Sequence, residues 1–340
     1  MINFFKNKKV LITGGTGSLG RALIKKLKKF QCEIIIYSRD EGKQSLYFGK
    51  DKDIIRIIGD IRDFEKLNYA LSIYKPNYVI HTAALKRIDD VEYYPDEAVK
   101  TNILGSINVT NACLLNKIDK CILISTDKAC QPINVYGATK FIAERMFLNQ
   151  DYYSSKAGHS TIFTSVRYGN VIASRGSFIP IWIDALENNE PIKVTSLDCT
   201  RFLFTLEDSV NTVLNSLMWG VGGEVFVPKL NSFTMQNVMN SIEFITKKPL
   251  KYIEIGMRPG EKFHEDMLAN SELPFTYTIP FDEEAKSFYC EELLCILPQY
   301  TQKSYAFKKY TGIELNSQLL LNTDQKFLNE LIIRGLKDAE

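Results

Sequence analysis

Six short apolar runs alternate with helical patterns over the first two hundred residues, and this alternation constrains the fold more than any other feature. The runs are rich in β-branched residues and read KVLITGG, EIIIYS, IIRIIGD, YVIHTAA, CILIST and FTSVRYG. Segments 19–29 and 95–115 between them repeat apolar residues with a helical period. Because strands that alternate with helices form parallel sheets, we expect an α/β fold, a doubly wound parallel sheet of the Rossmann type with helices on both faces.

The turn between the first strand and the first long helix is rich in glycine. The stretch LITGGTGSLGRAL carries four glycines between strand and helix. Glycines in this context allow a tight turn, a close backbone approach to a pyrophosphate and close packing of helix on strand. The amino end of the helix then faces the anion. The sequence therefore predicts a dinucleotide site, with cofactor contacts from Gly14, Thr16, Gly17, Ser18, Leu19 and Gly20.

The end of the second strand bears on which nicotinamide dinucleotide binds. A cofactor with a free ribose 2′-hydroxyl usually meets an acidic residue there, but this strand ends in Ser38 followed by Arg39, with Lys43 nearby. Guanidinium and ammonium groups suit a 2′-phosphate, so the sequence favours NADP over NAD. Asp40 keeps the alternative open, since it could bind a ribose if the strand ended later. Further cofactor contacts are expected from Asp60, Ile61, Thr82, Ala83, Ala84, Thr101 and Asn102.

The strand–helix rhythm changes beyond residue 170. A helix and a short strand follow, then a long helix capped near Thr205, then one more strand and a mixed remainder. No linker or repeat interrupts the chain, so we expect two lobes that share one body. The expected division is a cofactor-binding Rossmann domain of residues 1–169, rejoined by 203–228, and a smaller C-terminal substrate-binding lobe of residues 170–202 and 229–340.

Composition and charge argue against several classes of protein. The 340 residues carry a formal net charge of +2, too small a basic excess for a dedicated nucleic-acid binder. No apolar run approaches the roughly 18 residues of a membrane span, and the N-terminus lacks a signal-peptide core. Seven cysteines without Cys-x-x-Cys spacing and three scattered histidines predict reduced thiols and no metal site. We expect a soluble cytoplasmic protein without nucleic-acid or membrane partners.

The stretch STDKACQPINVYGATK, residues 125–140, gathers a carboxylate, two amines and a phenol. Tyr136 and Lys140 lie four apart, so a helix would set both side chains on one face. A free phenol has a pKa of about 10, and a neighbouring ammonium and an oxidised nicotinamide should both lower it. Such a tyrosine can take the proton of a sugar alcohol while hydride leaves for the cofactor. The pair predicts alcohol oxidation with Tyr136 as the base.

These motifs resemble the extended short-chain dehydrogenase/reductase family. The resemblance is closest to the branch of nucleotide-sugar 4,6-dehydratases that act on UDP-N-acetylglucosamine and invert carbon 5, within polysaccharide and pseudaminic-acid biosynthesis. Besides TGGTGSLG and YGATK, it rests on YSRDEGKQS, HTAALKRIDDVEYYPDEAVKTN, VRYGNVIASRGSFIP, TRFLFTLEDSV and GMRPGEKFHEDML. The motifs run in order to about residue 268, and the rest of the chain carries little of the resemblance.

The resemblance implies a dehydration in which the cofactor is regenerated. Oxidation at carbon 4 acidifies the proton on carbon 5; this proton and the carbon 6 hydroxyl then leave, and hydride returns to carbon 6. The implied enzyme is a hydro-lyase whose product is UDP-2-acetamido-2,6-dideoxy-β-L-arabino-hex-4-ulose. The motifs assign Tyr136 to oxidation and Lys140 to the ribose and phenol. They make Lys128 the base at carbon 5, Asp127 the acid for the departing hydroxyl, and Thr126 a partner of the carbon 4 oxygen.

The resemblance also implies a substrate groove and self-association. Tyr136 stands where some relatives place methionine, and a phenol on the face opposite Lys128 could deliver the proton that inverts carbon 5. A homo-oligomer, either dimer or hexamer, is expected. The implied contacts to UDP-N-acetylglucosamine are Lys86, Asn170, Val171, Ser174, Arg175, Phe178, Thr195, Arg201, Arg258 and Glu261.

Three alternatives stay open. A 4-epimerase of UDP-hexoses or UDP-N-acetylhexosamines would use the same fold and the Tyr-Lys pair but needs no base such as Lys128. A retaining 4,6-dehydratase would differ only in the configuration at carbon 5, and a catalytically inactive NADP-sensing protein would keep the fold alone. Ala173 stands where glycine is usual in VIASRG, which leaves the finer sugar preference open. The pathway that receives the keto sugar is open as well.

Overall fold

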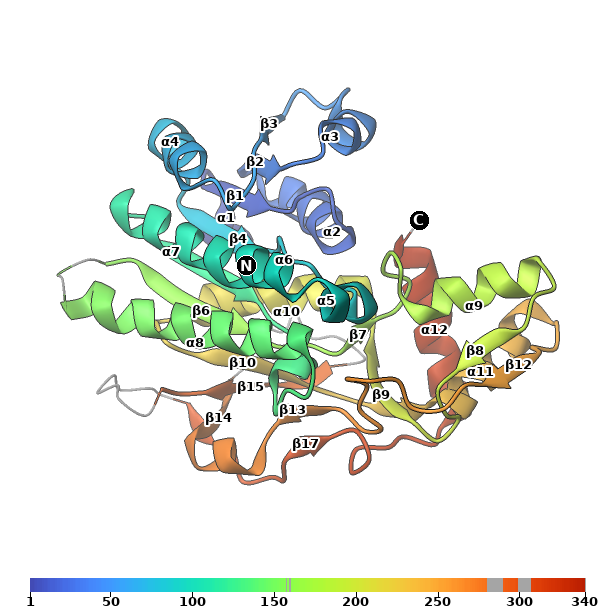
Figure 1. Cartoon of the computed structure of the whole chain (residues 1–340). Helices are drawn as coiled ribbons and strands as arrows, with labels where there is room; N and C mark the ends of the chain where they lie inside the picture. The colour runs from blue at the N-terminus through green and yellow to red at the C-terminus, as the bar shows by residue number, and fades with distance from the viewer. Residues whose placement is uncertain (157, 159, 280–289, 299–306, 340) are drawn as a thin grey trace.

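A large sheet forms the middle of the protein (Figure 1). The structure, a computed structural model, describes residues 1–156, 158, 160–279, 290–298 and 307–339, and in these ranges the sheet has ten strands. Seven pair in parallel, which confirms the predicted doubly wound fold. In spatial order they are β3 (Ile54–Ile58), β2 (Glu33–Ser38), β1 (Lys9–Thr13), β4 (Tyr78–His81), β5 (Lys120–Ile124), β6 (Ile162–Val166) and β10 (Val225–Leu230).

Alternating side chains of the parallel strands fill a hydrophobic core on each face of the sheet. In β1, Val10 and Ile12 enter one core while Leu11 enters the other, and all three are fully buried. Because each strand is apolar on both sides, it requires helices on both faces. The first core is covered by α2 (Ser18–Leu27) and α10 (Leu206–Trp219), and the second by α4 (Phe64–Tyr74), α7 (Gly105–Leu115) and α8 (Val135–Lys156).

Three C-terminal strands continue the sheet beyond β10 as antiparallel neighbours. They are β15 (Cys290–Ile296), β14 (Thr276–Ile279) and β16 (Lys308–Lys309). Part of the chain that sequence reasoning placed in the substrate lobe is thus hydrogen-bonded to the main sheet. The division into two domains stays a prediction.

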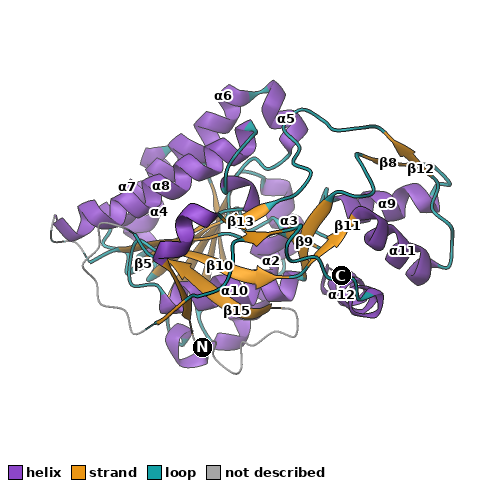
Figure 2. Ribbon diagram, turned by 90° about the horizontal axis from the view of Figure 1, so that it is seen from below, coloured by secondary structure: helices purple, strands orange, loops and turns teal. Residues whose placement is uncertain are grey.

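A smaller group of elements lies to one side of the sheet, away from β1, β2 and β3 (Figures 1 and 2). Its core is shared by α9 (Phe178–Glu187), α11 (Met235–Thr246) and α12 (Gln325–Ala339). Within the described part of the chain, short strands form three small sheets outside the large one. They are β7 (Asn170–Val171), β9 (Thr200–Phe204) and β11 (Ser232–Thr234) in one sheet, β8 (Ile192–Val194) with β12 (Tyr252–Glu254), and β13 (Asp266–Leu268) with β17 (Leu315–Asn316).

The remaining helical elements are short, apart from α3 (Glu41–Phe48). Among the described residues, no helix is both long enough and apolar enough to span a membrane. The short elements are α1 (Ile2–Phe5), α5 (Ile88–Tyr93), α6 (Pro95–Ala98), the π-helical turn η2 (Val99–Leu104), and the 3-10 turns η1 (Lys28–Phe30), η3 (Asp127–Ala129) and η4 (Asn270–Phe275). Of the short elements, α5, η2 and η3 contribute residues to the cavity described below.

Candidate active site

A cavity of about 970 Å³ lies at the carboxyl ends of the parallel strands, where doubly wound sheets bind ligands. Most of the residues singled out in the sequence line it. All five catalytic candidates do, namely Thr126, Asp127, Lys128, Tyr136 and Lys140. So do Gly14, Thr16, Gly17, Ser18, Leu19, Gly20, Ser38, Arg39, Lys43, Asp60, Ile61, Thr82, Ala83, Ala84 and Thr101 of the cofactor set, and Lys86, Asn170, Val171, Ser174, Phe178, Arg201, Arg258 and Glu261 of the substrate set.

The glycine loop leaves no space for side chains. Gly14 has φ of +69°, and a Cβ there would lie 2.9 Å from Thr82 Oγ1. A Cβ on Gly20 would lie 2.7 Å from Gly15 Cα, so larger residues would separate α2 from the turn. Helix α2 begins directly after Gly17 and directs its amino end at the cavity. The tight backbone and the exposed helix end fit the diphosphate of a dinucleotide, and the individual contacts stay a prediction.

At the far end of the cofactor groove, β2 ends at Ser38 as the sequence indicated. Asp40 then caps α3 by accepting a hydrogen bond of 2.8 Å from the Lys43 backbone N–H, and it also pairs with the Lys43 ammonium. The Arg39 guanidinium lies 3.6 Å from Asp60. The carboxylate that could have bound a ribose therefore starts a helix, and Asp40 lines the cavity together with the two cations Arg39 and Lys43.

The Tyr-x-x-x-Lys pair is held in place by the turn before it. The Asn134 side chain accepts a hydrogen bond of 2.6 Å from the Gly137 N–H at the start of α8. A Cβ on Gly137 would lie 2.1 Å from the Lys128 carbonyl oxygen, so glycine is needed for α8 to pack against η3. This close approach brings Tyr136 and Lys140 on α8 into the same cavity as Lys128.

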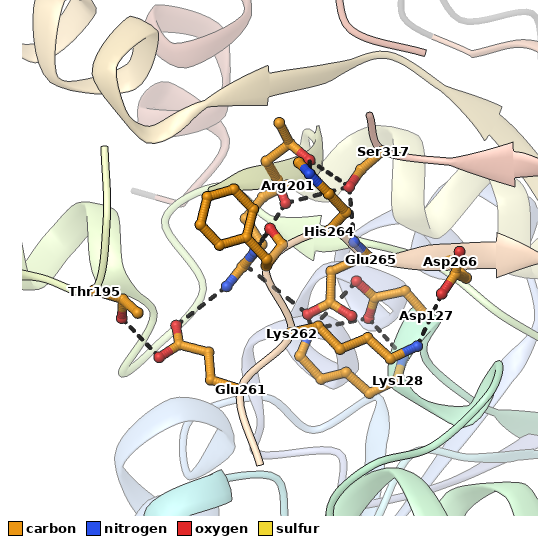
Figure 3. A network of polar contacts seen from close by, with 12 residues as sticks. Asp127, Lys128, Thr195, Arg201, Glu261, Lys262, His264, Glu265, Asp266 and Ser317 are labelled. Carbon is orange, nitrogen blue, oxygen red and sulfur yellow. Dashed lines mark hydrogen bonds and ion pairs between the residues drawn. The ribbon is translucent and has the colours of Figure 1, made fainter. Parts of the chain in front are cut away.

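A cluster of charged side chains forms part of the cavity lining, and Figure 3 shows its contacts. The Lys128 Nζ lies 3.1 and 3.2 Å from the two oxygens of Asp127 and 3.2 Å from Glu265 Oε1. Arg201 Nε is 3.9 Å from the same Glu265 oxygen, and Arg201 Nη2 donates a hydrogen bond of 3.1 Å to Glu261. The side chains of Asp127 and Glu265 are only 1% and 2% exposed, so these charges interact with little solvent between them.

Burial and neighbouring charges set the protonation of the catalytic candidates. Burial alone would lower the pKa of Lys128, but its two carboxylate neighbours outweigh it and raise the pKa. Burial lowers the pKa of Lys140 to about 8, against an opposing effect of Glu144. Burial raises the pKa of Tyr136 more than Lys128 and Thr126 lower it. The predicted effect of a neighbouring ammonium is present in Lys128, but burial outweighs it and leaves the phenol pKa raised.

Two predicted contact residues, Asn102 and Thr195, lie outside the cavity lining of the described chain. The Asn102 side chain accepts a hydrogen bond of 2.8 Å from the Leu85 N–H and donates one of 3.1 Å to Thr139. It thereby ties the loop after β4 to α8. Thr195 donates a hydrogen bond of 2.6 Å to Glu261, which does line the cavity. Thr195 therefore reaches the cavity through Glu261, whereas the partners of Asn102 lie outside the lining as well.

A third, Arg175, faces the cofactor side rather than the substrate side. Its backbone N–H donates to Ser18 Oγ at 3.1 Å, its guanidinium donates to Tyr47 Oη at 3.2 Å, and its carbonyl accepts from Lys86 Nζ at 3.0 Å. The loop that carries it also holds Ala173 at φ +58°, in the left-handed region. The glycine usual at this position in the resembling family would adopt this φ without strain.

Glu265 was not among the residues predicted from the sequence, although it lies in the segment GMRPGEKFHEDML. Only Arg258 and Glu261 of that segment were predicted to be substrate contacts. His264 lies outside any helix, with Nδ1 2.8 Å from Thr200 Oγ1. Only the fold reveals Glu265, because Lys128 and Glu265 belong to segments far apart in the chain. Within the described residues, no group of three or more His, Cys, Asp or Glu side chains is arranged for a metal ion.

The strand order, the glycine loop and the Tyr-Lys pair at the strand ends define the class of extended short-chain dehydrogenases/reductases. The model of the family described as polysaccharide biosynthesis protein matches residues 10–280, and the chain belongs to this family.

Named relatives divide between two reactions. The chain is 40% identical over 280 residues to a UDP-N-acetylglucosamine 4,6-dehydratase (inverting) of Campylobacter jejuni, covering 80% of this chain and 81% of the relative. It is 37% identical over 338 residues to a UDP-glucose 4-epimerase of Rickettsia bellii, covering 94% and 97%. Among solved structures, Pen from Bacillus thuringiensis superposes with a TM-score of 0.88 at 33% identity, over 97% of this chain and 98% of that one.

Proposed function

We propose that the protein is a UDP-N-acetylglucosamine 4,6-dehydratase that uses NADP and inverts carbon 5. The observation that carries this proposal is the position of the Asp127–Lys128 ion pair inside the same cavity as Tyr136 and Lys140. A 4-epimerase needs only the oxidation chemistry of the Tyr-Lys pair, whereas a dehydratase also needs an acid and a base for the elimination. The relative from Campylobacter jejuni carries the name of this reaction.

The first proposed step is oxidation at carbon 4. Tyr136 takes the proton of the carbon 4 hydroxyl, and Thr126 hydrogen-bonds to the same oxygen. The Lys140 ammonium favours the phenolate and holds the ribose of the cofactor. A bound nicotinamide would supply the acceptor for the carbon 4 hydride and the donor of that hydride to carbon 6, and the Tyr136 phenol would give its proton to carbon 5 from the face opposite Lys128. Arg39 and Lys43 would hold the 2′-phosphate of NADP.

The second proposed step uses the single proton that Asp127 and Lys128 share. Transfer of this proton from Nζ to the carboxylate gives a neutral amine beside a carboxylic acid, which are the base and acid of an elimination. Nζ then takes the proton from carbon 5, and Asp127 gives its proton to the carbon 6 hydroxyl, which leaves as water. The elimination ends with an ammonium beside a carboxylate, the ion pair that the structure contains.

The proposed substrate contacts follow the chemistry of a nucleoside diphosphate sugar. Arg201 and Arg258 line the cavity, and guanidinium groups bind phosphate oxygens through charge-assisted hydrogen bonds. Arg201 is the better anchored, since it is buried and its guanidinium also donates to the carbonyls of Thr200 and Phe263. Lys86 and Asn170 lie between the cofactor loop and this end.

One assay tests the proposal and separates the two named reactions. The protein is incubated with UDP-N-acetylglucosamine and NADP, and the product is analysed by mass spectrometry and NMR. We expect the loss of one water and an L-configured 4-keto-6-deoxy sugar. A product of unchanged mass would instead indicate epimerisation. This reaction is the second candidate because the relative from Rickettsia bellii is named a UDP-glucose 4-epimerase. A D-configured keto sugar would contradict inversion, and faster turnover with NAD would contradict the cofactor assignment.

A variant tests the role of Lys128. Lys128→Ala should lower the rate of dehydration at least about 100-fold, because general base catalysis contributes factors of this size. Lys25→Ala, at an exposed position on α2, serves as the matched control and should keep the wild-type rate. Unchanged dehydration in Lys128→Ala would remove lysine from the carbon 5 role.

A further inference from the structure

The side chain of Glu265 is fixed in the cavity by the fold around it. Its backbone N–H donates a hydrogen bond of 2.7 Å to Ser317 Oγ, and its carbonyl accepts one of 2.8 Å from the Ser317 N–H. Strand β13 begins and β17 ends next to these contacts, and the antiparallel pairing of the two strands holds this segment in place. The carboxylate lines the cavity, and Oε1 meets Lys128 while Oε2 has no hydrogen-bond partner among the described residues.

We propose that Glu265 is a positioning residue for Lys128: it holds Nζ in the cavity and stabilises the charge that develops on Nζ as the proton leaves carbon 5. This inference rests on the proposed function. Asp127 cannot do this work throughout the reaction, because it becomes a neutral acid before the elimination. Glu265 takes no part in that proton transfer, so it remains a fixed anion 3.2 Å from Nζ. Fixed charges aimed at developing charge lower the barrier of such steps.

The charged and titratable groups around Lys128 support this assignment. Asp127 approaches from η3, Glu265 from the segment before β13, Arg201 from β9 and Tyr136 from α8. Arg201 lowers the pKa of Lys128 and so opposes the effect of the two carboxylates. Its Nε lies 3.9 Å from the Glu265 oxygen that Lys128 Nζ contacts at 3.2 Å. Against burial, which would lower the pKa of Lys128, Asp127 and Glu265 raise it. Glu265 therefore makes Lys128 a stronger base.

The test measures the basicity of Lys128 directly in the full chain. Trace acetic anhydride labels only neutral amines, so the extent of acetylation at Lys128, read by mass spectrometry across a pH series, gives its pKa. Glu265→Gln keeps the shape and removes the charge, and it should lower the pKa of Lys128 by at least about one unit. Glu265→Asp keeps the charge and should stay nearer the wild type. Asp266→Asn is the matched control, because Asp266 pairs with Lys262 and should leave Lys128 unchanged.

Enzyme kinetics add a second readout. The Asp127–Lys128 pair is active while it holds one proton, so the rate of dehydration falls at alkaline pH, where that proton is lost. Glu265→Gln should move this alkaline fall to lower pH by as much as it lowers the pKa of Lys128. The maximal kcat should fall while KM changes little. An unshifted Lys128 pKa in a folded Glu265→Gln variant would overturn the proposal. Failure of the wild type to dehydrate UDP-N-acetylglucosamine would reject the proposed function, whereas the labelling result would still decide whether Glu265 controls Lys128.

Discussion

At the scale of single residues, Lys140 shows how a catalytic group opposes stability. Its side chain is 3% exposed, and burial lowers its pKa from 10.5 to about 8. A shift of this size corresponds to a cost on the order of 3 kcal/mol for keeping the buried ammonium at neutral pH. Such costs are common where function requires a charge in an apolar setting.

Replacing this lysine should therefore stabilise the protein. Between pH 8 and 10.5 the folded state binds fewer protons than the unfolded state, so the stability of the wild type rises across this range. Lys140→Met lacks that dependence. We expect it to be more stable by up to about 3 kcal/mol at neutral pH, with the gain vanishing towards the unfolded pKa.

Urea unfolding at several pH values measures the effect, with the exposed-site variant Lys25→Met as the control, whose stability should follow the wild-type pH dependence because Lys140 is retained. A Lys140→Met variant less stable than the wild type at neutral pH would show that the lysine contributes more through packing than it costs through its charge.

At the scale of elements, the sequence predicted what local chemistry determines. The residues around Thr205 predicted a capped helix, and α10 begins there with a capping box. The Asp208 N–H donates a hydrogen bond of 3.1 Å to Thr205 Oγ1, and the Thr205 N–H donates one of 3.4 Å to the Asp208 carboxylate. The spacing of Tyr136 and Lys140 was likewise enough to place both on α8 facing the cavity.

Loss of this cap should destabilise α10 and the core beneath it. Thr205→Ala removes the side-chain acceptor of the Asp208 N–H, so the free energy of unfolding should fall by about 1 to 2 kcal/mol. Thr205→Ser keeps the hydroxyl and should lose much less. Denaturant unfolding of both variants checks this, and equal losses would assign the effect to the missing methyl group rather than to the cap.

At the scale of the whole molecule, the parts that sequence reasoning missed all depend on contacts between distant segments. No local sequence feature of the C-terminal segment shows that β14 and β15 belong to the large sheet rather than to the smaller lobe. Their place depends on the pairing of β15 with β10, which forms only when the whole sheet is assembled. Asn102 reads as a ligand contact because a buried amide that braces two elements has the same sequence signature. Glu265 reaches Lys128 only after β13 has been placed beside the main sheet.

The link between these segments can be tested at Arg167, at the end of β6. Its fully buried guanidinium donates to Glu144 of α8 at 3.1 and 2.7 Å and to Glu272 of η4 at 2.8 Å twice. Arg167→Met removes the guanidinium from both carboxylates and leaves Glu272 with the more distant Arg145, whose Nη2 is 3.9 Å away. Breaking a buried ion pair in this way costs about 3 to 5 kcal/mol.

A triple variant, Arg167→Met with Glu144→Gln and Glu272→Gln, removes the charges together and should recover part of that loss. Urea unfolding of the single and triple variants measures both effects. Burial would raise the pKa of Glu272, but Arg167 outweighs it and lowers the pKa. The stability that this pairing contributes is therefore present at neutral pH and disappears as the pH falls through the lowered pKa. If Arg167→Met left the free energy of unfolding unchanged, apolar packing alone would hold the C-terminal segment, and with it Glu265, against the sheet.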